Sequence, residues 1–156
     1  MISLSYDEHA KSIGITILQP ATPVGAYVPA VRGGTLLFTA GQRPMKEGVP
    51  VFKGKIGQDL TVQQGYEAAK LATLNCLAAA KSVLGTLDQI ECVVKVSGYV
   101  NSAQGFTDQA KVMNGASDVL GQIFGERGHH ARTSVGVSEL PMNIAVEVEL
   151  VLACRP

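Results

Sequence analysis

Residues 128–152 read GHHARTSVGVSELPMNIAVEVELVL, and this stretch decides the fold. Apolar and polar residues alternate on both sides of Leu140-Pro141, a pattern typical of two half-buried strands. Val135 and Val137 supply the apolar positions of the first strand, and Val146 and Val148 supply those of the second. We therefore predict a β-hairpin that turns at Leu140-Pro141.

The same hairpin gathers charged residues on its other face. Residues that lie opposite each other in an antiparallel pair share a face. The expected register therefore places Ser134 near Glu147, and Arg132 within reach of both Glu147 and Glu149. An arginine beside two carboxylates has two interpretations that the pattern leaves open. One is a solvated surface, and the other is an anion-binding group beside an acid/base.

The remaining elements are expected from capping boxes, apolar periodicity and glycine stops. They are a short helix from Ser5 to about Gly14, an extended connector over 15–24, strands over 27–31 and 36–39, a hairpin or loop near 49–52, a helix over 61–83, a strand over 90–100 and a helix over 106–124. This order predicts an α+β fold with a single mixed or antiparallel sheet and both long helices on one face. Residues 1–156 are expected to form one domain with a short N-terminal helical extension of about residues 1–20.

Composition narrows the classes of partner. The 156 residues carry 13 basic and 13 acidic side chains, so nothing in the net charge favours nucleic acid. Hydrophobic residues make up 46% and charged residues 17%, which suggests that other subunits cover part of the apolar surface. We find no targeting segment, no membrane span and no disulfide or zinc pattern among the three cysteines. A cytoplasmic protein without membrane contact is expected.

Several motifs carry a family resemblance. The C-terminal part of the chain resembles the signature of the Rid/YjgF family of imine and enamine deaminases, some of which are called endoribonuclease L-PSP. The matching residues are Ala131-Arg132, the β-strand pattern that follows them, Leu140-Pro141 and Val146–Glu149. The step of 15 residues from Arg132 to Glu147 equals the spacing in that family. The resemblance extends to three upstream segments: Pro23–Ala30, Thr35–Gln42, and the helix with Asn114–Ser117 and Phe124-Gly125.

The resemblance implies a chorismate-mutase-like (Rid) fold, in which three sheets pack into a trimeric barrel with active sites in the clefts between subunits. It implies that the planar guanidinium of Arg132 binds a substrate carboxylate through two hydrogen bonds, while Glu147 orients a water molecule and transfers its proton. Glu149 is left a structural role. The further ligand contacts implied by the family are Tyr27, Gly41, Asn114 and Ser134.

The expected activity is therefore cofactor-free hydrolysis of reactive 2-imino or enamine acids to 2-oxo acids and ammonium, by a homotrimer that needs no metal. Two positions depart from the best-known deaminases: Ser134 replaces a cysteine, and Ala40 replaces a serine before the glycine-glutamine turn. Ala40 favours a first alternative, a non-enzymatic binding or regulatory protein for a small carboxylate metabolite. Ribonuclease activity is a second alternative. The His129-His130 doublet has no accompanying ligand set, and a metal role is not expected.

Overall fold

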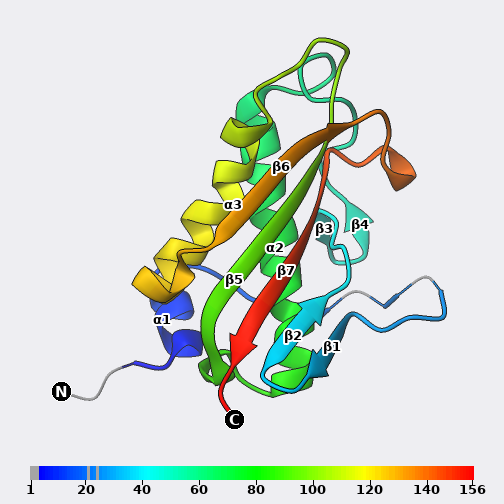
Figure 1. The fold of residues 1–156 in the computed structure, drawn as a ribbon. Coiled ribbons are helices and arrows are strands. Elements are labelled where there is room, and N and C mark those ends of the chain that lie inside the picture. Colours follow the sequence, from blue (N-terminus) through cyan, green and yellow to red (C-terminus); the bar gives the residue numbers. More distant parts are fainter. Residues whose placement is uncertain (1–3, 21, 24) are drawn as a thin grey trace.

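Five strands form one mixed sheet in the computed structural model, which describes residues 4–20, 22, 23 and 25–156 (Figure 1). The spatial order is β1-β2-β7-β5-β6, and every neighbouring pair is antiparallel except β5 and β6, which run parallel. The strands are β1 (Ala30–Gly33), β2 (Leu36–Thr39), β5 (Ile90–Asn101), β6 (Ala131–Val137) and β7 (Val146–Cys154). The expected α+β fold with a mixed sheet is confirmed, although residues 45–50 form a second, two-stranded sheet.

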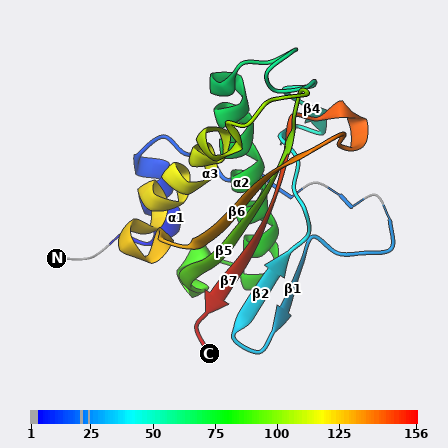
Figure 2. The ribbon, with the colours of Figure 1, turned by 45° about the horizontal axis from the view of Figure 1, so that its top comes forward.

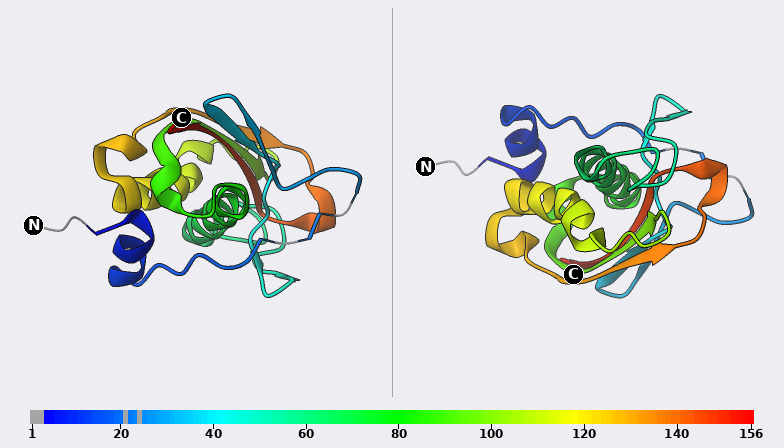
Figure 3. Two further views of the ribbon diagram at one scale, coloured as in Figure 1. Left: turned by 90° about the horizontal axis from the view of Figure 1, so that it is seen from below. Right: turned by 90° about the horizontal axis from the view of Figure 1, so that it is seen from above.

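Two long helices, α2 (Val62–Leu84) and α3 (Gln109–Phe124), cover one face of this sheet, and the sheet curves around them (Figure 3). α2 begins at a capping box, in which the Thr61 hydroxyl accepts from the Gln64 N–H and the Gln64 side chain accepts from the Thr61 N–H. It ends at Gly85, whose positive φ of 82° suits a residue without a Cβ. The predicted helix over 61–83 is confirmed, whereas α3 begins three residues later than expected.

The core lies between the helices and the sheet. Alternate residues of β7 point inward, and Val146, Val148, Leu150 and Leu152 are fully buried beneath α2 and α3. Val96 and Val100 on β5, the register partners of Leu150 and Val146, share that face. The opposite face of the sheet is open. It carries Glu147 and Glu149 from β7, Ser97 and Tyr99 from β5, Thr133 and Val135 from β6, and Val31 and Phe38 from β1 and β2.

The predicted hairpin of residues 128–152 is wrong. Both strands exist, but β5 lies between them, paired parallel with β6 on one side and antiparallel with β7 on the other (Figure 2). Parallel strands need a long crossover, and α3 supplies it between β5 and β6. The segment after β6, with the 3₁₀ turn Pro141–Asn143, then carries the chain past the end of β5 to β7.

The short N-terminal helix α1 (Tyr6–Ser12) starts at the predicted capping box of Ser5 and Glu8 and packs beside α3. Its Tyr6 ring meets Phe124 edge-on with centroids 4.8 Å apart, and its Asp7 forms a salt bridge of 2.6 Å with Lys81 of α2. Residues 1–3 of the expected extension lie outside the described residues, as does Val24 of the Pro23–Ala30 motif.

Smaller elements complete the chain. They are the two-residue strands β3 (Met45–Lys46) and β4 (Val49–Pro50), which form the hairpin expected near Val49, and 3₁₀ turns at Leu87–Gln89 and Gly125–Gly128. Over the described residues, no helix combines the length and the apolar content that crossing a bilayer requires.

Candidate functional site

Arg132 lies on the edge strand β6, and its side chain points toward α3. One guanidinium nitrogen, Nη1, donates to Asn114 Oδ1 and to Ser117 Oγ, each at 3.0 Å, and Nη2 donates to the Ala110 carbonyl at 3.3 Å. These bonds use three of the five N–H donors of an arginine. The structure therefore fixes the side chain from one side and leaves Nε and one hydrogen of Nη2 for a ligand. It also brings the predicted residue Asn114 to Arg132.

Glu147 lies on β7, with its side chain on the open face of the sheet. The carboxylate sits directly against Gly41, where a Cβ would overlap it, so the glycine provides the room that the acid occupies. Burial raises the pKa of Glu147, the positive charge of Arg43 lowers it, and Glu149 raises it again, with a net upward shift. A carboxyl group with a raised pKa exchanges protons more readily near neutral pH.

The two principal residues lie on opposite faces of the sheet within one chain. Arg132 is in register with the core residue Val96, whereas Glu147 is in register with Tyr99 on the open face. The prediction that Arg132 lies within reach of Glu147 and Glu149 is therefore wrong, as is the predicted proximity of Ser134 to Glu147. Both predictions assumed that β6 and β7 pair directly as a hairpin. Because β5 lies between the two strands, Arg132 and Ser134 face the helices, whereas Glu147 and Glu149 face the open side of the sheet.

Glu149 has a structural partner on the open face. Its Oε1 accepts a hydrogen bond of 3.0 Å from the Tyr99 hydroxyl on the neighbouring strand, and this bond raises the pKa of that tyrosine. Among the described residues, no group donates such a fixed hydrogen bond to the Glu147 carboxylate.

Tyr27 and Arg43 lie near Gly41, the glycine against which the Glu147 carboxylate sits. Both line a small pocket with Gly41 beside the β1 entry, and Tyr27 is 52% exposed. Arg43 was not anticipated from the sequence, although it follows the Gly41-Gln42 turn directly. Its Nη1 contacts Met142 Sδ at 2.9 Å, and its charge acts on Glu147. Its position directly after the turn was the only indication in the sequence that this cation would lie near the site.

Ser134 shares the helix-covered face with Arg132, two residues further along β6. Its hydroxyl is buried and has no hydrogen-bond partner within the part of the chain that the structure describes. A serine hydroxyl can donate one hydrogen bond and accept two, so this group retains capacity for a ligand or a water. The predicted site residues thus form two groups, Arg132 with Asn114 and Ser134, and Glu147 with Gly41 and Tyr27.

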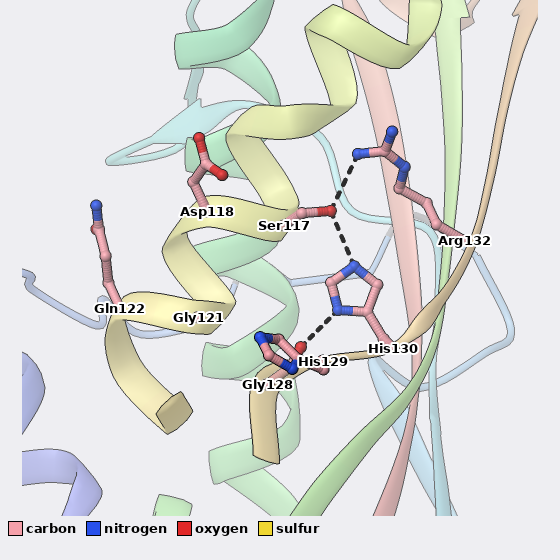
Figure 4. Close-up of a pocket in the computed structure, with 8 residues that line it drawn as sticks. All are labelled: Ser117, Asp118, Gly121, Gln122, Gly128, His129, His130 and Arg132. Atoms are coloured by element: carbon pink, nitrogen blue, oxygen red, sulfur yellow. Dashed lines mark hydrogen bonds between the residues drawn. The ribbon is translucent and has the colours of Figure 1, made fainter. Parts of the chain in front are cut away.

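A pocket of about 710 Å³ opens beside Arg132, between α3 and the start of β6 (Figure 4). Ser117 and His130 lie within it, and Ser117 Oγ is 2.9 Å from His130 Nε2. The sequence did not predict that Ser117 and His130 would meet in a pocket, because 13 positions separate them in the chain and the histidine doublet belongs to no motif. Within residues 4–20, 22, 23 and 25–156, no three His, Cys, Asp or Glu side chains gather as a metal site would require.

Comparison with known proteins agrees with this architecture. Residues 8–153 match the family described as "YjgF/chorismate_mutase-like, putative endoribonuclease". Protein TCP17 of Trypanosoma cruzi is 40% identical over 140 residues, which cover 89% of this chain and 88% of that protein.

Two solved structures resemble the chain along almost its whole length. The first is Atu1372, a protein of unknown function from Agrobacterium tumefaciens, with 36% identity and a TM-score of 0.89, covering 96% of this chain and 92% of its own. The second is described as "a putative endoribonuclease" from Shewanella oneidensis MR-1, with 33% identity and a TM-score of 0.93, covering 96% and 99%. From the family match over residues 8–153 and these relatives together, the chain belongs to the Rid/YjgF family.

Proposed function

We propose that the protein is a cofactor-free hydrolytic deaminase, which converts reactive 2-imino acids and their enamine forms to 2-oxo acids and ammonium. Family membership supports the proposal, as does the Arg132–Glu147 pair at the family's spacing. We place the reaction in the cytoplasm, where free thiols persist, because Cys76, Cys92 and Cys154 are all unpaired.

The observation that carries the proposal is the placement of Arg132 and Glu147 on opposite faces of one sheet. A single substrate can meet both residues only where the Arg132 edge of one chain approaches the open face of another. The open face suits such contact because Val31, Phe38 and Val135 leave apolar surface exposed on it. We propose a homotrimer, with the number three taken from the family, and sites built from two chains.

The chemistry follows from the two groups. Arg132 binds the substrate carboxylate through the donors that α3 leaves free and thereby orients the imine carbon. Glu147 takes a proton from water as the oxygen attacks that carbon, and then gives the proton to the nitrogen. Glu147 then moves the hydroxyl proton of the resulting carbinolamine to its nitrogen, the carbon–nitrogen bond breaks as the carbon becomes the ketone of a 2-oxo acid, and the ammonia released takes a proton from solvent to become ammonium. Ser134 and Asn114 line the Arg132 side, and Tyr27 and Gly41 line the Glu147 side.

Mixing two inactive variants tests both the residues and the assembly. Arg132→Ala and Glu147→Gln are purified separately and assayed for release of 2-oxobutanoate from freshly generated 2-iminobutanoate. Each variant is expected to lose about 10²-fold or more in turnover. Co-refolded at equal amounts, the two should recover about a quarter of the wild-type activity, because random assembly pairs an intact arginine with an intact glutamate at that frequency.

Three results would contradict the proposal. Full activity in Glu147→Gln would remove that carboxylate from the mechanism, and full activity in Arg132→Ala would remove the clamp. No recovery in a mixture that size-exclusion chromatography shows to be mixed oligomers would mean that the two residues do not serve one site across chains.

A non-enzymatic carboxylate-binding protein is the second candidate, because Ala40 offers no hydroxyl beside Gly41. This candidate predicts that wild-type protein binds 2-oxobutanoate in calorimetry but does not accelerate imine hydrolysis. Ribonuclease activity, named for the Shewanella relative, ranks third, since a net charge of zero gives little attraction for RNA phosphates.

A further inference from the structure

A chain of hydrogen bonds runs through the pocket between α3 and β6, from a backbone carbonyl to the arginine. His130 Nδ1 is 2.6 Å from the Gly128 carbonyl, His130 Nε2 is 2.9 Å from Ser117 Oγ, and Arg132 Nη1 is 3.0 Å from the same oxygen (Figure 4). The three side chains come from two elements, since Ser117 belongs to α3 and the others lie at or just before β6.

The carbonyl fixes the tautomer of His130. A carbonyl oxygen only accepts, so Nδ1 must carry the hydrogen, and in the neutral ring Nε2 is then an acceptor. The Ser117 hydroxyl therefore donates its hydrogen to Nε2. Burial lowers the pKa of His130, the bond to Gly128 raises it, and the charges of Arg132 and His129 lower it further, with a net decrease. The ring is accordingly neutral and able to take a proton at pH 7.

The serine hydroxyl is directed away from its own helix. A serine inside a helix commonly bonds to a carbonyl of the preceding turn, as Ser82 of α2 does with Ala79 at 2.7 Å. The Ser117 hydroxyl instead forms hydrogen bonds with His130 and Arg132. The arginine donor stabilises negative charge that develops on Oγ, so the serine has a base on one side and a cation on the other.

The surroundings hold this arrangement and leave it accessible. A Cβ on Gly128 would overlap the Leu120 carbonyl, so the glycine allows the tight turn that presents its own carbonyl to His130. Gly121 leaves open space in the pocket wall. The carboxylate of Asp118 accepts a hydrogen bond of 2.7 Å from the Tyr66 hydroxyl, an exposed pair on the pocket rim that joins α3 to α2.

We propose that Ser117 is a nucleophile activated by His130, and that this pocket hydrolyses small carboxylic esters. A nucleophile, a base within hydrogen-bond reach and a third group that orients the base are the arrangement that covalent catalysis requires. This activity shares Arg132 with the imine hydrolysis proposed above, but its nucleophile and base are Ser117 and His130, and it does not involve Glu147.

The steps balance with water as the only co-reactant. Ser117 Oγ attacks the ester carbonyl carbon while its hydrogen passes to His130 Nε2. The bond to the alcohol oxygen breaks, and His130 gives the hydrogen to the leaving alcohol. Water then attacks the acyl–serine and gives a hydrogen to His130, the bond to Oγ breaks, and Ser117 regains its hydrogen. The free donors of Arg132 can stabilise the carbonyl oxygen as it becomes negative.

Covalent labelling tests the proposal on the full-length protein. The protein is incubated with a small fluorophosphonate, the labelled peptide is identified by mass spectrometry, and hydrolysis of p-nitrophenyl acetate is followed in parallel. We expect the adduct on Ser117, no adduct in Ser117→Ala, and labelling slowed by about 10²-fold in His130→Gln. Ser82→Ala, which removes a helix serine without a base, should label as the wild type does. The labelling rate should fall as pH decreases through the His130 pKa, because the protonated ring cannot accept the hydrogen.

Several outcomes would overturn the proposal that Ser117 is a nucleophile activated by His130. An adduct on another residue, or none at all, would remove Ser117 as a nucleophile. An unchanged rate in folded His130→Gln, checked by circular dichroism, would show that the serine reacts without its base. A rate that does not fall on acidification, down to the lowest pH at which the protein stays folded, would show the same.

Discussion

The carboxyl group of Glu147 is partly buried, and this burial affects both the expected activity and the stability of the protein. Its pKa lies above the usual value of 4.5, chiefly through burial. We expect Glu147→Gln to lose at least about 10²-fold in turnover, because the amide cannot take or return a proton. Glu149→Gln serves as the control, since an amide oxygen can still accept from Tyr99 and turnover should be largely retained.

The same substitution has a predictable effect on stability as pH changes. A carboxyl group whose folded pKa is raised binds its proton more tightly in the folded state, so it favours folding below its unfolded pKa. That contribution is lost as pH rises through the folded pKa. Glu147→Gln removes the dependence, and its melting temperature relative to wild type should therefore rise between pH 4 and pH 8. A constant difference across this range would mean that the Glu147 pKa is not raised.

Gly41 separates activity from stability in a single substitution. The Cβ of Gly41→Ala would meet the carboxyl end of Glu147, a flexible group that can turn away. We expect turnover to fall by about tenfold or more while the free energy of unfolding changes by less than about 1 kcal/mol, since no backbone must move. Turnover at the wild-type level would show that the carboxylate does not work from its position against Gly41.

At the scale of elements, the crossing of α2 and α3 depends on Gly115. A Cβ at this position would overlap the backbone carbonyl of Tyr66 on α2, and backbone cannot turn aside. We expect Gly115→Ala to lower the free energy of unfolding by about 1–3 kcal/mol in urea titration, as overpacking does. Gly121→Ala on the same helix meets nothing within 4 Å and should be neutral or gain up to about 1 kcal/mol from helix propensity. Equal effects of the two substitutions would contradict the close crossing.

Local signals predicted the helices and most of the strands, whereas the pairing of β6 with β7 was predicted wrongly. The capping boxes at Ser5 and Thr61 involve residues three apart, so their meaning does not depend on the rest of the chain. The neighbour of β6 is instead chosen by the crossover through α3, which no local pattern in residues 128–152 records. The types of residue at the candidate site were predictable from the family spacing, whereas their sides of the sheet were not, and the Ser117–His130 contact exists only through the packing of α3 on β6.

At the scale of the whole molecule, the open sheet face is the surface on which the proposed trimer depends. Phe38 is 48% exposed there and pairs with Val31, which is 55% exposed. We expect sedimentation equilibrium to give three times the chain mass of 16.4 kDa for the wild type, and a single chain for Phe38→Asp, because a charge in an apolar interface is left unpaired. Val49→Asp, on the β3–β4 hairpin and 61% exposed, is the matched control and should remain trimeric. A wild type at 16.4 kDa would exclude the trimer.

The position of β7 in the sheet also affects how the protein folds during its synthesis on the ribosome. β7 is synthesised after every other described strand, yet it lies in the middle of the sheet and joins the β1–β2 hairpin to β5 and β6. Until it emerges, two pieces of sheet wait with unpaired edges, and such edges are open to other nascent chains. We therefore expect slow translation or a stall before Val146 to increase aggregation more than a stall at any earlier strand, and chaperone demand during synthesis to peak at that point.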